Sequence, residues 1–342
     1  MKWLKRILLS LSVLLFVLCA GIYFYLQSQK PVYSGELRLT GLSDKTEVFF
    51  DTYGVPHIYG KNEADVFRAL GYIHAQERLF QMELIRRVSS GRISELFGSS
   101  VLDVDRFFRM LGILEHAKAS AAEFEKHKAE PWFVAATAYL EGVNEYIEKG
   151  KTPLEFTLLS IPKEKFEIKD LYLIVSYVSF NFQMAFRTDP LQDKIKNEWG
   201  IKYLQDLGLE TYDSLMHNSG DSLMAIKKDN LLSAFESIQE KLPIQIWSGS
   251  NSMLIAANKS KSGKVLFEND THIGHQQPSV WYESHLECPG FRFYGSWIAG
   301  FPFAALGHSE RHAWGITIFE NDDLDFYKER VNPEDSNQVW VQ

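Results

Sequence analysis

The chain has 342 residues, of which 45% are hydrophobic and 14% aromatic, and this composition excludes a disordered or fibrous protein. Its formal net charge of -8 is spread along the chain, with no Lys/Arg cluster interleaved with aromatic residues, so we expect no nucleic-acid partner. Its two cysteines, Cys19 and Cys288, cannot form a disulfide framework, and we expect Cys288 to be a buried core residue.

The first 30 residues carry the pattern of a membrane helix. Lys2, Lys5 and Arg6 precede a largely apolar, uncharged run over 7–26, and a helix of about 20 residues spans roughly 30 Å, the thickness of the hydrocarbon core of a bilayer. Bulky aromatic residues end the run, where a cleaved signal sequence has small ones. The pattern therefore favours a membrane anchor in 1–30 over a removed signal sequence, with the rest of the chain facing the periplasm or cell exterior.

Helical and strand patterns then follow in chain order. Alternating residues predict strands over 36–39 and 47–51, and Pro and Gly predict a turn over 54–60. Apolar residues at helical spacing predict helices over 62–87, 107–124, 132–148 and 170–184, and the polar stretch 194–241 is expected to be peripheral. Strands are predicted over 253–257, 264–267, 280–286, 291–294 and 313–319. A helix-rich first part followed by strands predicts an α+β fold.

Ser250 stands where the helical part meets the strand part. Gly249 has little steric bulk, so the Ser250 hydroxyl can approach the preceding carbonyl, a geometry that permits an N-to-O acyl shift and self-cleavage. The freed α-amine would titrate near ~7.7–8.0 and could act as base for its own hydroxyl. The tripeptide Gly-Ser-Asn alone is also typical of a simple turn before a strand.

His272 is the nearest candidate for a group that assists Ser250. Two predicted strands, joined by a turn at Gly263, separate them, which would bring His272 back beside Ser250. An imidazole there can orient or tune the amine, although a structural turn histidine fits the same pattern.

A run of motifs resembles a known family. The segments 51–59 (DTYGVPHIY), 71–82 (GYIHAQERLFQM) and 86–98 (RRVSSGRISELFG) are similar, in order and spacing, to the opening of penicillin acylase (penicillin amidase) precursors, and 142–144 and 153–156 continue the match. The resemblance implies a four-layer αββα N-terminal nucleophile hydrolase. It also implies cleavage at Gly249-Ser250 into a first chain, 31–249, with a spacer near 220–249, and a second chain that begins with 250–342.

The resemblance also implies roles for single residues. Ser250 would be the nucleophile and, through its amine, the base. His272 matches a histidine that glutaryl- and homoserine-lactone-type acylases have beside the serine. The backbone N–H of Ile318 matches the oxyanion-hole donor, a kind of group worth roughly 2.7–4 kcal/mol in acyl transfer.

A calcium site is implied in the same way. Hard oxygen ligands such as those of Asp322 and Asp325, with the Leu324 carbonyl, suit a structural calcium ion, and Asp189 is the candidate ligand from the first chain. Without the resemblance, the acidic segment is typical of a solvated loop. His57, His74 and Arg78 lie in the most family-like stretch, and we interpret them as structural hydrogen-bonding residues.

The expected function is hydrolysis of a linear amide, which removes an acyl group from a small penicillin-, cephalosporin- or acyl-homoserine-lactone-like compound. The two processed chains would stay associated. The alternative is a catalytically inactive, membrane-anchored binding or scaffold protein with the same fold. The sequence has no Gly-x-Ser-x-Gly elbow, which disfavours a classical serine hydrolase. The family's second oxyanion donor matches positions downstream of Gln342, so we expect this sequence to be a fragment of a longer protein.

Overall fold

The computed structural model describes residues 2–183, 185–209, 237–242, 247–318, 324 and 330–340. Its helices are α1 (Lys2–Gln29), α2 (Glu63–Ser89), α3 (Ser94–Phe97), α4 (Leu102–Met110), α5 (Ile113–Phe124), α6 (Pro131–Lys149), α7 (Leu154–Leu158), α8 (Ile168–Asn181), α9 (Ala185–Trp199) and α10 (Ile201–Asp206). Its strands are β1 (Glu47–Phe50), β2 (Pro56–Tyr59), β3 (Trp247–Ile255), β4 (Leu266–Ile273), β5 (Trp281–Cys288), β6 (Phe291–Ile298), β7 (Leu306–Ser309), β8 (Ala313–Trp314), β9 (Arg330–Asn332) and β10 (Asp335–Trp340).

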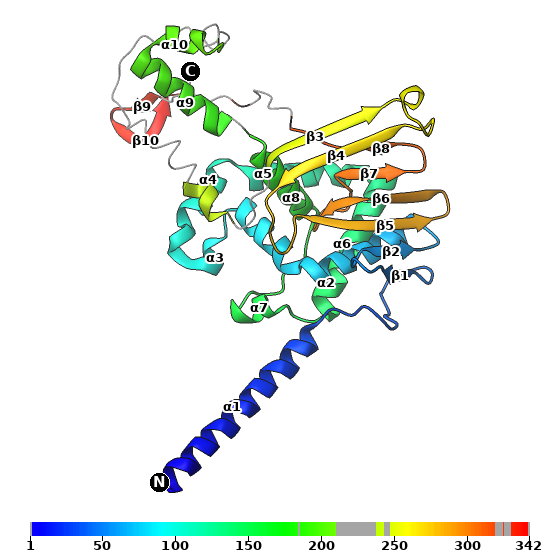
Figure 1. The fold of residues 1–342 in the computed structure, drawn as a ribbon. Helices are drawn as coiled ribbons and strands as arrows, with labels where there is room; N and C mark the ends of the chain where they lie inside the picture. Colours follow the sequence, from blue (N-terminus) through cyan, green and yellow to red (C-terminus); the bar gives the residue numbers. More distant parts are fainter. Residues whose placement is uncertain are drawn as a thin grey trace.

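Six of these strands form one sheet in the order β1-β2-β5-β6-β7-β8 (Figure 1). The pairing of β2 with β5 is parallel, and the other pairs are antiparallel. Helix α2 contacts β2, β5, α6 and α8. Strands β3 and β4 form a separate hairpin, as do β9 and β10. The described residues confirm a mixed helix-and-sheet fold, whereas the four-layer arrangement stays a prediction.

The start of the sheet differs from the sequence prediction. The turn lies over 51–55, where Asp51 Oδ1 accepts hydrogen bonds from the N–H groups of Tyr53 (2.8 Å) and Val55 (3.0 Å), and Gly54 has a φ of +80°. The predicted turn over 54–60 is therefore wrong in its second half, which is β2. Strand β1 pairs with β2, and the strand predicted over 36–39 is wrong, since that segment has no regular structure.

The helix predictions succeed where apolar spacing is uninterrupted. Helix α2 begins after Asn62, whose side chain accepts a hydrogen bond from the Asp65 N–H (2.8 Å) and caps the helix. The single helix predicted over 107–124 is wrong, because Gly112 has a φ of +69° and separates α4 from α5. The strand predicted over 313–319 is shorter, since only β8 is regular among its described residues.

Two glycines of the family-like motifs let α2 and α6 touch backbone to backbone. A Cβ atom at Gly71 would lie 2.0 Å from the Tyr139 carbonyl oxygen, and one at Gly142 would lie 1.9 Å from the Arg68 carbonyl oxygen. No side chain fits in either place, so this helix crossing requires glycine at both positions.

Buried polar groups join this helix pair to the part of the chain after Ser250. His74 is fully buried, and its Nδ1 lies 2.8 Å from the Tyr139 hydroxyl, whose oxygen accepts a hydrogen bond from the Gly300 N–H (2.9 Å). Burial, assisted by the nearby Arg78 charge, lowers the pKa of His74 to about 3, so its ring is neutral. Cys288 is buried with the core residues, as predicted.

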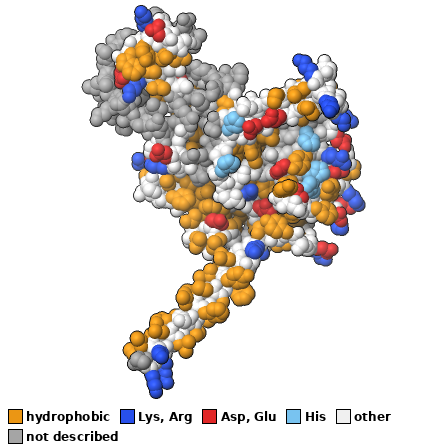
Figure 2. Space-filling view, viewed as in Figure 1, with side chains coloured by type: hydrophobic (Ala, Val, Ile, Leu, Met, Phe, Trp, Pro, Cys, Tyr) orange, Lys and Arg blue, Asp and Glu red, His pale blue; other side chains and the backbone are white. Residues whose placement is uncertain are grey.

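Helix α1 projects from this body as a separate rod (Figure 1). Its 28 residues have a mean hydropathy of 2.6 in the most apolar window, and none of that window is buried; Figure 2 shows hydrophobic side chains along its length and basic ones at its tip. Its length and composition are sufficient to cross a membrane, and a signal sequence meets the same criteria.

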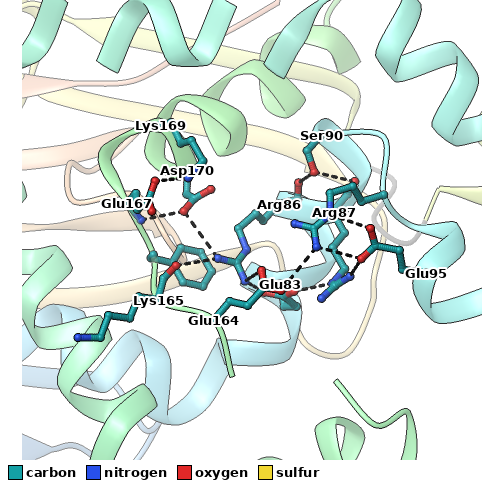
Figure 3. Close-up of polar contacts among 12 residues, drawn as sticks. Glu83, Arg86, Arg87, Ser90, Glu95, Glu164, Lys165, Glu167, Lys169 and Asp170 are labelled. Atoms are coloured by element: carbon teal, nitrogen blue, oxygen red, sulfur yellow. Dashed lines mark hydrogen bonds and ion pairs between the residues drawn. The ribbon is translucent and has the colours of Figure 1, made fainter. Parts of the chain in front are cut away.

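The motif over 86–98 builds a buried ion network at the end of α2 (Figure 3). Glu83 pairs with Arg86 and with Arg87, whose Nε lies 2.5 Å from Glu83 Oε1. Arg86 also donates to the Lys165 carbonyl (3.1 Å) and faces Asp170 at 3.6 Å. Burial raises the pKa of Glu83, and the two arginines oppose that rise. The network thus fastens α2 to α8 and the loop before it.

We expect Glu83→Gln to destabilise the complete protein by about 3 kcal/mol, because it removes the one fully buried carboxylate that contacts both Arg86 and Arg87. The free energy of unfolding in urea measures this. The control is Glu95→Gln, which removes the solvent-side partner of Arg87, a carboxylate whose side chain is 45% exposed, and should cost no more than about 1 kcal/mol. Equal losses in the two variants would contradict a special role for the buried network.

Candidate active site

Ser250 lies within strand β3 rather than in a turn before it. It pairs with Thr271 of β4, and Gly249 pairs with His272. The ladder shifts register between Trp247 and Gly249, an irregularity of the kind that re-aims side chains beside functional sites. The Ser250 side chain is partly buried.

The backbone N–H of Ile318 points at the Ser250 hydroxyl. Its nitrogen lies 2.9 Å from Ser250 Oγ, and the N–H donates to that oxygen. The structure therefore brings together two residues that the sequence analysis singled out, from the start of the hairpin and from the segment that follows β8.

Asn269 of β4 holds this arrangement and was not identified as a site residue from the sequence. Its Nδ2 donates to the carbonyls of Asn251 (3.1 Å) and Ile316 (2.9 Å), and its Oδ1 accepts from the Ile316 N–H (3.1 Å). A Cβ atom at Gly315 would lie 2.5 Å from Asn269 Cγ, so glycine is needed for this contact. Asn269 thereby ties the backbone before Ile318 to the strand that contains Ser250.

His272 lies beside the Gly249–Ser250 peptide link. Its Nδ1 would be 3.1 Å from a Cβ atom placed on Gly249, and its Nε2 is 3.1 Å from Asp270 Oδ2 and 3.3 Å from Asn251 Nδ2. Its side chain is 42% exposed, so the ring is open to solvent and small molecules.

The predicted calcium ligands are only partly described. Asp322 and Asp325 lie outside the described residues. Leu324 is partly buried against the hydrophobic core, and Asp189, in α9, accepts a hydrogen bond from Thr188 Oγ1 (3.1 Å). Within the part of the chain that the structure describes, no group of three or more His, Cys, Asp or Glu side chains is placed to hold a metal ion. Calcium stays a prediction.

The other conspicuous residues of the family-like motifs make contacts away from Ser250. His74 bonds to Tyr139, as given above, and Arg78 lies 5.4 Å from the Tyr282 ring centroid. These contacts agree with structural roles. His57 faces a second histidine, His285.

Comparisons with known proteins place these observations in one family. The family model described as Penicillin amidase matches residues 45–342. Acyl-homoserine lactone acylase QuiP from Pseudomonas aeruginosa is 28% identical over 91% of this chain and 37% of its own length. Penicillin acylase 2 proenzyme from Pseudomonas sp. is 28% identical over 89% of this chain and 40% of its own. Penicillin G acylase from Escherichia coli is 23% identical over 87% and 42%.

A solved structure is similar over part of the chain. It is a thermostable penicillin G acylase from Alcaligenes faecalis, with a TM-score of 0.38 and 21% identity over 53% of this chain and 96% of that one. The present chain spans about two fifths of the length of the curated relatives named above. The family model covers most of the sequence, including Ser250, His272 and Ile318, and this chain belongs to the penicillin amidase family.

Proposed function

We propose that the protein is an N-terminal serine amide hydrolase that removes an acyl group from a small N-acylated compound. The observation that carries this proposal is the 2.9 Å hydrogen bond from the Ile318 N–H to Ser250 Oγ, in a chain of the penicillin amidase family. In acyl transfer, negative charge develops on the carbonyl oxygen of the carbon that the hydroxyl attacks, so a backbone donor beside Ser250 Oγ lies close to the position of that oxyanion.

In the first step, the chain would cleave itself before Ser250. The Ser250 hydroxyl attacks the Gly249 carbonyl carbon, the C–N bond breaks, and the hydroxyl proton passes to the departing nitrogen. Water then hydrolyses the resulting ester, which yields a carboxylate at Gly249 and a free α-amine at Ser250. The absence of a Cβ at Gly249 and the His272 ring beside it support this step.

In turnover, the new amine takes the proton of its own hydroxyl while Oγ attacks the substrate's amide carbonyl. The Ile318 N–H stabilises the oxyanion of the tetrahedral intermediate, the leaving amine takes up the proton, and water hydrolyses the acyl-serine ester. Since the intact chain already presents the Ile318 N–H to the Ser250 side chain, few rearrangements are needed between the two steps.

For the substrate, the relatives favour a small acylated amine. Those named above are acyl-homoserine lactone and penicillin acylases, and the His272 ring lies beside the Gly249–Ser250 link. A panel of N-acyl homoserine lactones, penicillin G and glutaryl-cephalosporins tests this class. A structural calcium ion at Asp322, Leu324, Asp325 and Asp189 belongs to the same proposal, and no chemical step above depends on it.

Asn269 is proposed to act as a positioning residue for the oxyanion donor. Its side chain forms three hydrogen bonds with backbone groups of Asn251 and Ile316. Loss of these bonds frees the segment that carries the Ile318 N–H, and a displacement of about 1 Å at a catalytic group can lower rates by about 100-fold.

Helix α1 is proposed to tether the protein to a membrane, with the remaining residues on the periplasmic or outer side. Its 28 residues span about 42 Å as a helix, more than the hydrocarbon core needs. Basic residues precede the apolar run, which favours this orientation.

Ser250→Ala, made in the complete reading frame, is expected to block cleavage and to abolish amide hydrolysis, because it removes the only hydroxyl that can accept the acyl group in this mechanism. Ser250→Cys should retain cleavage, since a thiol can perform the same shift. Gel electrophoresis and intact mass measure processing. Ser252→Ala is the matched control, since Ser252 donates to the Glu268 carbonyl in the same hairpin, and it should be processed like the wild type. If Ser250→Ala is still cleaved, the proposed mechanism is wrong.

Asn269→Ala is expected to lower kcat by about 10- to 100-fold with a smaller change in KM. Amide hydrogen exchange at Ile316 and Ile318 should accelerate in the same variant, a readout that separates loss of positioning from general unfolding. Ser252→Ala should change neither kcat nor the exchange rates of these two amides. Unchanged exchange at these amides would contradict the positioning role.

Membrane fractionation of cells that express the complete protein tests the tether. We expect the protein in the membrane fraction and resistant to alkaline extraction. Its N-terminal residue should be Met1 or Lys2, so that α1 is still present. Deletion of 1–30 should move it to the soluble fraction. A wild-type protein that is soluble and begins downstream of α1 would show a removed signal sequence instead.

A further inference from the structure

The outer face of the six-stranded sheet carries a histidine pair that the proposed chemistry does not use. His57 of β2 and His285 of β5 are register partners in the parallel pair. Their neighbours Ile58 and Leu286 point inward and are fully buried, so the histidines lie on the opposite face, with 28% and 13% of their side chains exposed. Figure 2 shows histidine side chains at the surface over this sheet.

The two imidazoles face each other through the same ring nitrogen. The distance between the Nδ1 atoms is 3.4 Å, and the ring centroids are 5.3 Å apart with the planes at 60°. Two histidine nitrogens bound to one tetrahedral zinc ion at about 2.05 Å each lie about 3.3–3.4 Å apart, with ring centroids about 5.2 Å apart. A collinear N–H···N hydrogen bond of the same length would separate the centroids by about 5.7 Å.

Each imidazole presents its second nitrogen to a carboxylate. His57 Nε2 lies 3.7 Å from Asp51 Oδ2, and His285 Nε2 lies 3.6 Å from Glu287 Oε2. Metal-ligating histidines usually donate their other N–H to a carboxylate, which orients the ring and raises its basicity. At 3.6–3.7 Å the two carboxylates lie at ion-pair rather than hydrogen-bond distance, so the pair has a carboxylate near each outer nitrogen as well as the spacing.

Both carboxylates are held in place by their other oxygen. Asp51 Oδ1 accepts from the Tyr53 and Val55 N–H groups in the turn before β2, and Glu287 Oε1 accepts from Arg292 Nη2 (2.7 Å). Because one oxygen of each carboxylate is already fixed by hydrogen bonds, the other oxygen faces its histidine without any further loss of side-chain freedom.

The protonation state also suits a cation. Burial, followed by the proximity of His57, holds the pKa of His285 below its usual range, so its ring is neutral at neutral pH. A neutral imidazole is the form that binds metal.

We propose that His57 Nδ1 and His285 Nδ1 bind a divalent zinc-like transition-metal ion across strands β2 and β5, with Asp51 and Glu287 orienting the two rings. The remaining coordination positions belong to water at this exposed face. Since β2 precedes Ser250 and β5 follows it, the ion would bridge the two parts of the chain. This site is separate from the calcium site proposed above, which uses oxygen ligands.

Isothermal titration with Zn²⁺ tests the site on untagged, EDTA-treated complete protein at neutral pH, with excess Ca²⁺ present to fill oxygen-ligand sites. We expect one zinc ion per chain whose binding is lost in His57→Gln and in His285→Gln. His308→Gln is the control, since His308 lies exposed on β7 of the same sheet beside Tyr294, and it should bind zinc like the wild type. A wild-type protein that takes up no zinc, or glutamine variants that bind it unchanged, would overturn the proposal.

Asp51→Asn provides a second test that leaves both imidazoles in place. Asparagine keeps the oxygen that accepts from the turn but removes the charge that faces His57, so the affinity for zinc should fall about 10- to 100-fold. An unchanged affinity would overturn the assigned role of Asp51. The zinc site requires no cleavage of the chain, so Ser250→Ala should bind zinc normally even though it blocks processing. Failure of the zinc proposal can therefore be distinguished from failure of the proposed hydrolase function.

Discussion

The parallel pairing of β2 with β5 unites two stretches of chain that lie on either side of Ser250. Other contacts reinforce it across the same divide. The Tyr282 hydroxyl donates to Glu77 (2.8 Å), the Gln81 side chain donates to the Ser279 carbonyl (3.1 Å), and the Tyr139 hydroxyl oxygen accepts from the Gly300 N–H. One core thus contains residues from both parts, so a break in the backbone before Ser250 would leave them joined through the sheet and the core.

This shared body provides the rigid support that the candidate site needs. The β3–β4 hairpin sets Gly249 opposite His272. Asn269 fixes the backbone at Ile316, so that the Ile318 N–H reaches Ser250 Oγ. None of these groups works alone: a serine in a strand is a weak nucleophile, and a backbone N–H matters only where charge will develop. Their chemistry arises from placement, which depends on the body beneath the hairpin.

The sequence predicted the features that depend on local pattern. The apolar spacing over 62–87 predicts α2 nearly to its ends. The family resemblance assigns Ser250 and Ile318 to one site, and the structure has them in hydrogen-bond contact. Features that depend on distant partners were missed. Asn269 meets Ile316 across 47 positions and His57 meets His285 across 228, and neither spacing carries a sequence signal. The turn predicted over 54–60 hides β2, because Pro56 and the flanking glycines are turn residues, although the segment pairs with both β1 and β5. Gly112 interrupts a helical pattern that the apolar residues continue.

The proposed chemistry depends on an amine that is released at Ser250 and then activates the hydroxyl of the same residue. Its most direct measurement is the N-terminal sequence and intact mass of the active, purified complete protein. We expect two polypeptides, the second of which begins with Ser250-Asn251-Ser252-Met253 and has an unmodified α-amine. Efficient amide hydrolysis by a protein whose chain is continuous through Gly249 and Ser250, or whose Ser250 amine is blocked, would contradict it.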